Sequence, residues 1–251
     1  MFPSFRVGRL FGFPIRVHLS FILLLGMVVL FMGGLAGLAV VLMVAGSVLL
    51  HELGHALVAR HLNVSVSEIG LHFFGGAARL AGLPRRPGDE IAIAVAGPAV
   101  SFMLAGLGHG LAAVTGVSVF ALFGWVNLVL GAFNLLPVFP SDGGRILRAL
   151  LARRRGLVRA TEIAVTIGRV ACVALIAGGL YLGSVQMVFV AVALWTFGTA
   201  ERLAVRSRGD HGAWSGQGAL PLVHAEYLPP ADVRRESFVP GARRTAFVWR
   251  R

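Results

Sequence analysis

The feature that most constrains this chain is a group of two histidines and a glutamate at the end of a long uncharged run. Residues 17 to 50 contain no Asp, Glu, Lys or Arg, and the run leads directly into His51, Glu52 and His55. Ionisable side chains at membrane depth are costly and mark function by default. Positions i and i+4 share one helix face, so both imidazoles can reach one metal ion while Glu52 reaches its water. This HExxH pattern is typical of a zinc peptidase, here in a sequence suited to a membrane.

Composition supports a membrane protein independently. The 251 residues are 57% hydrophobic and only 14% charged, whereas soluble domains average about 25% charged. All 23 basic residues are Arg, and they lie in blocks at the ends of apolar runs. Such blocks predict membrane topology and contact with lipids, so we expect no nucleic-acid partner despite the net charge of +12. The single cysteine, Cys172, excludes a disulfide framework and a cysteine-based zinc site.

The apolar runs predict a polytopic α-helical membrane protein with about six transmembrane helices. The expected spans are residues 15–31 and 35–59, two within 91–141 and two within 170–200. The alternative for 170–200 is one long tilted helix, which would separate the last arginines from the others. With six spans, all arginine blocks share one side, and the turns near 33, 116 and 183 carry no charge. The positive-inside rule then places both termini in the cytoplasm.

The membrane core is expected to comprise residues 1–206, with two parts of different character. Residues 63–83 alternate and contain glycines, which predicts a small β-hairpin inserted between the second and third spans. This hairpin is either a plain connector or a substrate-binding edge at Gly75, Gly76, Ala77 and Ala78, which would pair with an extended peptide. Residues 143–159 form an Arg-rich amphipathic cytoplasmic segment. The tail, 207–251, is rich in Pro and Arg, and we expect it to be cytoplasmic and mostly disordered.

A third metal ligand is needed, because a catalytic zinc ion usually takes three protein ligands and keeps one position for water. Asp142 is the best candidate, since no other acid lies between Glu90 and Glu162. Two prolines before it interrupt the helix, and the following Gly143 and Gly144 permit a tight turn that aims the carboxylate inward. The alternative for Asp142 is the N-cap of a helix.

Taken together, these residues show that the chain resembles the site-2 protease family of intramembrane zinc metalloproteases. The similarity includes GRLFGFPI at 8–15, HELGH at 51–55, FGG at 74–76, AGPA at 96–99 and NLLPVFPSDGG at 134–144. It covers roughly residues 5 to 205. Residues 91–200 leave no room for a PDZ insert, and the sequence after Arg206 is too short for paired CBS domains. The chain therefore looks most similar to the minimal branch that includes the sporulation sigma-factor processing protease.

The resemblance implies one zinc ion (Zn2+) per chain, bound by His51, His55 and Asp142, with Glu52 as the catalytic acid and base. Asn134 matches the asparagine of the family motif, which implies a role in positioning the substrate or stabilising the oxyanion. The implied reaction is hydrolysis of a peptide bond in or near a transmembrane segment of another membrane protein, as in regulated intramembrane proteolysis. The implied location is a bacterial or archaeal cell membrane.

Two other functions use the same residues. A membrane metal transporter or channel would use the His and Asp cluster as a permeation site, but transporters usually show internal repeats and polar residues in several spans. An inactive relative would bind membrane segments without cutting them. The presence of both Glu52 and Asp142 argues against that second alternative.

Overall fold

The computed structural model describes residues 3–72, 75–80, 84 and 86–207. Two of the predictions therefore lie outside the described residues, wholly or almost wholly. One is the disordered cytoplasmic tail at 207–251, of which only Ser207 is described, and the other is Phe74 of the FGG motif.

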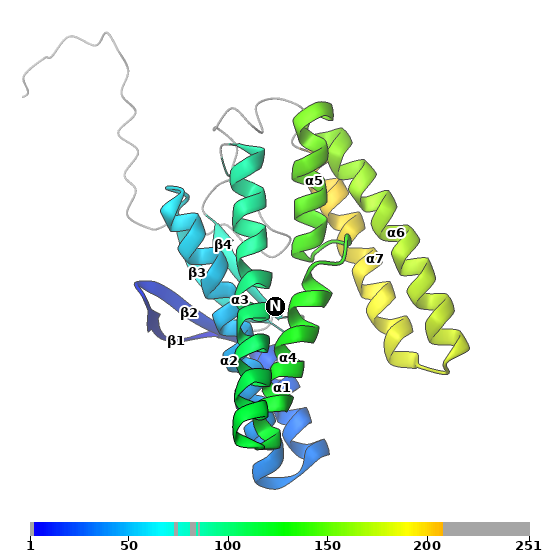
Figure 1. Ribbon diagram of the computed structural model, residues 1–251. Helices are drawn as coiled ribbons and strands as arrows, with labels where there is room; N and C mark the ends of the chain where they lie inside the picture. Colours follow the sequence, from blue (N-terminus) through cyan, green and yellow to red (C-terminus); the bar gives the residue numbers. More distant parts are fainter. Residues whose placement is uncertain (1–2, 73–74, 81–83, 85, 208–251) are drawn as a thin grey trace, which may run out of the picture.

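Within the described residues the chain forms seven helices and one four-stranded sheet (Figure 1). The helices are α1 (Leu19–Met32), α2 (Gly34–His61), α3 (Pro87–Thr115), α4 (Ser118–Asn134), α5 (Asp142–Arg155), α6 (Leu157–Tyr181) and α7 (Val185–Arg206). The strands are β1 (Ser4–Leu10), β2 (Phe13–His18), β3 (Val66–His72) and β4 (Gly75–Leu80).

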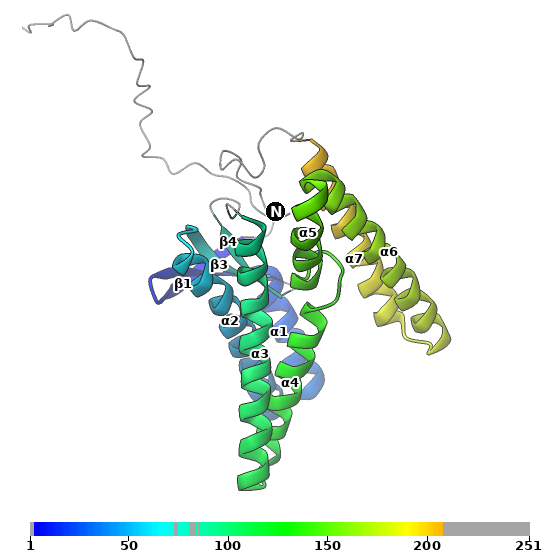
Figure 2. The ribbon, with the colours of Figure 1, turned by 45° about the horizontal axis from the view of Figure 1, so that its top comes forward.

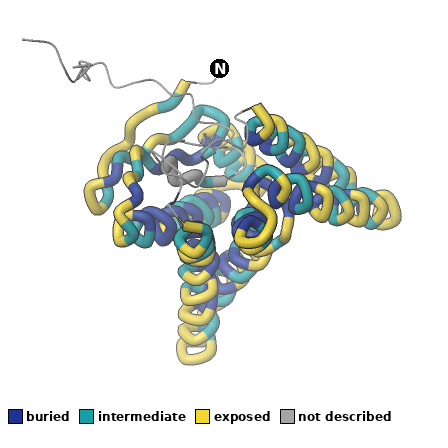
Figure 3. Tube along the Cα trace, turned by 90° about the horizontal axis from the view of Figure 1, so that it is seen from above, coloured by how far each residue is buried: buried dark blue, intermediate teal, exposed yellow. Residues whose placement is uncertain are grey.

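Four of the helices, α2, α3, α6 and α7, are long and apolar enough to cross a membrane, and α1 and α4 are shorter apolar helices. Large apolar side chains cover the outside of these helices. Leu30, Leu35 and Val114, for example, are 84%, 85% and 87% exposed. Figure 3 shows buried residues where the helices meet and exposed ones on the outer turns. An apolar exterior around an interior that contains buried His, Glu and Asp side chains is the reverse of a soluble protein. The protein is therefore a mostly helical membrane protein.

The sheet has the order β1-β2-β3-β4, so β4 is one of its two edge strands. Strands β3 and β4 are antiparallel and lie in the 63–83 segment for which we predicted a hairpin. Strand β2 pairs in parallel with β3, through Ile15 with Ile69 and Val17 with Leu71. The sequence prediction missed β1 and β2 and began the first span at Ile15, whereas α1 begins at Leu19. The β3 residues that pair with β2 lie more than fifty positions away, and local periodicity carries no signal of such a pairing. The pairing of β1 with β2 is local, with a turn at Phe11 and Gly12, and the sequence prediction overlooked it.

Two boundaries near the C-terminal helices also differ from the prediction. Helix α6 begins at Leu157, immediately after Gly156 ends α5 with a φ of 71°, so the predicted segment 143–159 is divided between two helices. Arg169 lies twelve residues into α6, where its guanidinium contacts Thr199 and Trp195 of α7. Residues 182–184 divide the 170–200 run into two helices, which excludes the single long helix.

The elements form two groups joined by α5. The sheet packs on one side of α2, and α1 to α4 lie together, while α6 and α7 form an antiparallel pair that stands apart (Figures 1 and 2). Helix α5 packs against α3 of the first group and α6 of the second. The position of α5 is therefore set from both sides, and its first residue is Asp142.

Candidate metal centre

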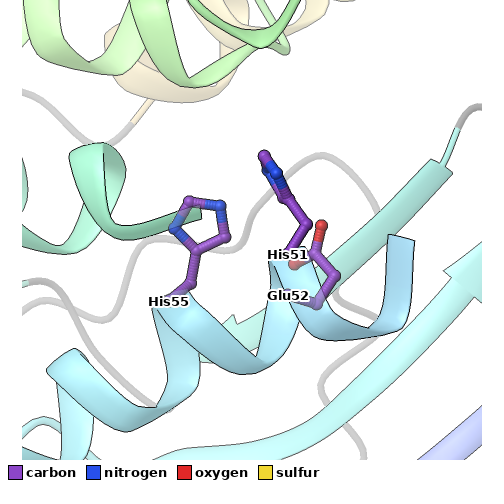
Figure 4. Close-up of side chains that lie close together, drawn as sticks. All are labelled: His51, Glu52 and His55. Carbon is purple, nitrogen blue, oxygen red and sulfur yellow. The ribbon is translucent and has the colours of Figure 1, made fainter. Parts of the chain in front are cut away.

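The two histidines of the HExxH pattern converge because α2 is a continuous helix through them. His51 and His55 are 2% and 4% exposed, and their ring centroids are 4.9 Å apart. Figure 4 shows both rings and the Glu52 carboxylate extending from the same side of α2. One potential ligand atom from each of these three residues lies within 4.8 Å of the other two. This group of three buried side chains can hold a metal ion.

Asp142 approaches the same point from α5. Its Oδ2 lies 3.2 Å from Nε2 of His51 and 3.2 Å from Nε2 of His55. The N-cap of α5 is Ser141 and Asp142 is the first helical residue, so the capping alternative is wrong. At Gly143 an added Cβ would overlap the carbonyl oxygens of the preceding loop. Glycine here lets the chain fold back closely enough to bring the Asp142 carboxylate to the histidines.

Helix α3 orients both imidazoles through hydrogen bonds. Nδ1 of His55 donates to the carbonyl oxygen of Ile93 at 2.7 Å, and Nδ1 of His51 lies 2.9 Å from Oγ of Ser101. A carbonyl oxygen only accepts, so Nδ1 of His55 carries a hydrogen and Nε2 is left free to bind a metal. Neither Ile93 nor Ser101 was identified from the sequence. Ile93 acts through its backbone, which no side-chain pattern reveals, and Ser101 had only its i+4 spacing from Gly97 as a signal.

Gly97 brings the backbone of α3 directly against the site. A Cβ added at this position would overlap Nε2 of His55 and would lie 2.6 Å from Nε2 of His51. Glycine therefore keeps open the space on which the two Nε2 atoms converge. Any larger residue would fill it.

The geometry fits a zinc ion. Zinc binds imidazole nitrogen and carboxylate oxygen at about 2.0–2.2 Å, so two ligand atoms at a tetrahedral angle are about 3.3 Å apart. The distance from Oδ2 of Asp142 to each Nε2 is 3.2 Å. Two imidazoles and one carboxylate are also a known ligand set of catalytic zinc, which leaves one position for water or substrate.

The other predicted residues lie in α4 and β4. Asn134 is the last residue of α4, and its Nδ2 donates to the carbonyl oxygen of Leu130 at 2.9 Å. An oxyanion role for Asn134 therefore requires its second amide hydrogen. Gly75, Gly76, Ala77 and Ala78 all lie in β4. A Cβ added at Gly76 would overlap the Glu52 side chain, so the backbone of the edge strand lies against Glu52.

Comparison with known proteins agrees with this geometry. The family model described as Peptidase family M50 matches residues 39–118 and 109–175. The zinc metalloprotease MJ0392 of Methanocaldococcus jannaschii is 34% identical over 210 residues, which cover 79% of this chain and 60% of the relative. Stage IV sporulation protein FB of Bacillus subtilis is 36% identical over 110 residues, which cover 43% of this chain and 38% of the relative.

A solved structure also matches. The site-2 protease from Methanocaldococcus jannaschii aligns with a TM-score of 0.63 and 32% identity, covering 80% of this chain and 95% of that chain. A membrane fold with a buried His, His and Asp cluster defines a candidate metal centre within the membrane protein. The chain belongs to peptidase family M50 and has the site-2 protease fold, which confirms the resemblance. It spans about half to three fifths of the length of the first curated relatives it matches.

The close approach of Gly97 generates a prediction. Gly97→Ala should lower zinc affinity at least tenfold, because the added methyl occupies the space beside both Nε2 atoms. Gly106→Ala is the matched control, since it adds the same methyl to α3 where nothing lies within 4 Å. Chelator competition on the purified protein measures the affinity. Equal affinities for the two variants would show that the ion does not lie between α2 and α3.

Proposed function

We propose that the protein is an intramembrane zinc endopeptidase that hydrolyses a peptide bond in or near a transmembrane segment of another membrane protein. The observation that carries the proposal is the position of one Asp142 oxygen, at 3.2 Å from Nε2 of both His51 and His55. All three side chains are buried, and they lie among helices with an apolar exterior. A protease centre in this place serves substrates that are themselves in the membrane.

In this proposal His51, His55 and Asp142 hold the zinc ion and Glu52 moves protons. An ion held by these residues would supply Lewis-acid chemistry, lowering the pKa of a water molecule toward ~7 and polarising the scissile carbonyl group. Glu52 accepts the proton of the attacking water at its carboxylate and then passes it to the leaving amine. The second amide hydrogen of Asn134 shares the charge that develops on the carbonyl oxygen. Ser101 and the carbonyl of Ile93 hold the two imidazoles in position throughout.

Two carboxylates lie at the site, and their positions support different roles. Oδ2 of Asp142 is at the ligand-to-ligand distance from both imidazoles. Glu52 follows His51 on the same helix, and the backbone of β4 lies against its side chain. A substrate held along β4 would therefore place its peptide bond next to Glu52. This arrangement favours Asp142 as the ligand and Glu52 as the acid and base.

The edge position of β4 supports substrate binding by strand addition. A helical substrate hides its amides in internal hydrogen bonds, so a segment must unwind before it is cut. An extended segment can then pair with the free edge of β4, as in other cases of strand addition. The proposed substrate-pairing residues are Gly75, Gly76, Ala77 and Ala78.

We further propose that α1 and α4 cross the membrane with the four longer helices, so that both termini are cytoplasmic. Helix α4 has 17 residues, or about 25 Å of rise against a hydrocarbon core of about 30 Å, a mismatch that local thinning accommodates. The turns after α1, α3 and α6 carry no charge, whereas α5 carries five arginines. Reporter fusions at Gly116 and Gly183 test this arrangement, and a cytoplasmic signal from either would contradict it.

A transporter or channel is less compatible with the site. A permeation site needs an open path, but the backbone of α3 at Gly97 lies against the two imidazoles. A transporter would need only His51, His55 and Asp142 as metal ligands. It would give no role to Glu52, although the Glu52 side chain is buried at the centre. An inactive relative would not need Glu52 either. The proteolytic function accounts for all four buried side chains.

The first test of the function is Glu52→Gln. The change preserves shape and removes the proton acceptor, so cleavage should fall at least a hundredfold while about one zinc ion per chain is retained. The uncut substrate should accumulate in membranes of cells that carry the variant, and comparison of the membrane proteomes identifies it. Glu162→Gln, at an exposed carboxylate on α6, is the matched control and should cleave normally. Wild-type cleavage by Glu52→Gln would exclude the proposed mechanism.

A second test concerns the edge strand. Ala77→Pro and Ala78→Pro each remove one backbone N–H of β4, and neighbouring residues point their N–H groups to opposite sides of the strand. One of the two variants should therefore lose most cleavage of a membrane-embedded substrate without loss of zinc or expression. A substrate segment made less helical with glycine near the cut site should partly restore the rate. If both proline variants cleave at the wild-type rate, β4 does not bind substrate.

A further inference from the structure

A second group of buried charges lies away from the metal centre. Arg148 of α5 is 4% exposed, Glu90 of α3 is 5% exposed and Glu201 of α7 is 9% exposed. Nε and one terminal nitrogen of Arg148 donate to Oε1 of Glu90, and the other terminal nitrogen donates to Oε1 of Glu201. Three helices that are far apart in the sequence are thus joined by one guanidinium group.

Stability alone does not account for this charge cluster. Removing three charges from water is costly, and apolar replacements of such clusters are often neutral or stabilising. Burial acts to lower the pKa of Arg148, but Glu90 and Glu201 more than offset this and the pKa is raised. The guanidinium therefore stays charged, and its bonds keep their direction. What such a cluster supplies is a fixed geometry between the helices that it joins.

Arg148 also contacts the segment that presents Asp142. Its guanidinium carbon lies 5.3 Å from the centre of the Phe139 ring, and Phe139 is three residues before Asp142. On the α3 side, Glu90 is one helical turn before Ile93, whose carbonyl orients His55. The cluster thus connects the element that carries the carboxylate ligand with the element that orients the imidazole.

We propose that Arg148, held by Glu90 and Glu201, is a positioning residue that fixes the orientation of α5 and thereby brings Asp142 to the metal. This inference rests on the proposed function, in which Asp142 is a zinc ligand. Asp142 and Arg148 are six residues apart, which is about 9 Å along the axis and about 120° around it. Two attachments on different faces fix both the tilt and the rotation of a helix.

Small rotations matter at this distance from the axis. A side chain that ends about 5–6 Å from the helix axis moves by about 1 Å when the helix rotates by about 10°. Metal sites tolerate deviations of only about 0.2 Å in ligand distance. Helix α5 is amphipathic and Arg-rich, so apolar packing supports only part of its surface. The hydrogen bonds of Arg148 to Glu90 and Glu201 fix the rest of the orientation of α5.

The test uses the purified full chain with Co2+ in place of zinc, because the visible absorption of Co2+ reports its coordination geometry. The main variant replaces all three charges, as Glu90→Gln, Arg148→Met and Glu201→Gln together, so that no unpaired charge stays buried. We expect an unfolding temperature close to that of the wild type, a metal affinity lower by at least tenfold and an altered Co2+ spectrum. The matched control is Glu162→Gln with Arg206→Met, which removes an exposed ion pair between α6 and α7.

Two further variants make the outcome decisive. Arg148→Lys keeps the charge but not the two hydrogen bonds that converge on Oε1 of Glu90, and it should lower metal affinity several-fold with the same spectral change. Wild-type affinity and spectrum in the triple variant, or in Arg148→Lys if the triple variant does not fold, would overturn the positioning role. The variant Asp142→Ala distinguishes failure of the positioning role of Arg148 from failure of the proposed function. Wild-type metal binding by Asp142→Ala would remove Asp142 from the ligand set, whatever the cluster does.

Discussion

The structure depends on the convergence of α2 and α5 on one point, with α3 packed against it. Two imidazoles from α2 and one carboxylate from α5 meet at 3.2 Å, although about ninety residues separate them in the sequence. Buried polar groups without hydrogen-bond partners are costly. These side chains can therefore converge only when the elements that carry them are held in place. The packing of α3 supplies the hydrogen-bond partners of the imidazoles and the glycine that leaves space between them.

Glycines allow the backbone to approach neighbouring groups closely at three places around this centre. Gly97 of α3 approaches both imidazoles, Gly76 of β4 approaches Glu52, and Gly143 of α5 approaches the loop before it. At each position a Cβ would overlap a neighbouring group. The glycines therefore allow four segments of the chain to approach one small volume. The close approach of Gly76 also places the edge strand β4 beside Glu52, the residue that we propose moves the proton.

The sequence predicted the residues that converge at the site better than the elements that hold them in place. His51, Glu52, His55 and Asp142 were identified because polar side chains are rare in apolar runs, and the structure brings all four together. The pairing of β2 with β3 was missed, because parallel partners far apart leave no local pattern. Ile93 and the cluster of Glu90, Arg148 and Glu201 were missed for related reasons. A backbone carbonyl has no side-chain signature, and charges at the ends of apolar runs or in an Arg-rich amphipathic segment are expected to be solvated.

We propose that one zinc ion is bound by His51, His55 and Asp142, and that Glu52 acts on water and does not ligate the ion. X-ray absorption at the zinc edge, on the wild type, Glu52→Gln and Asp142→Ala, tests it most directly. We expect nitrogen and oxygen donors at about 2.0–2.2 Å with no sulfur, an unchanged first shell in Glu52→Gln, and loss of an oxygen donor or of the ion in Asp142→Ala. A first shell that changes in Glu52→Gln and persists in Asp142→Ala would contradict it.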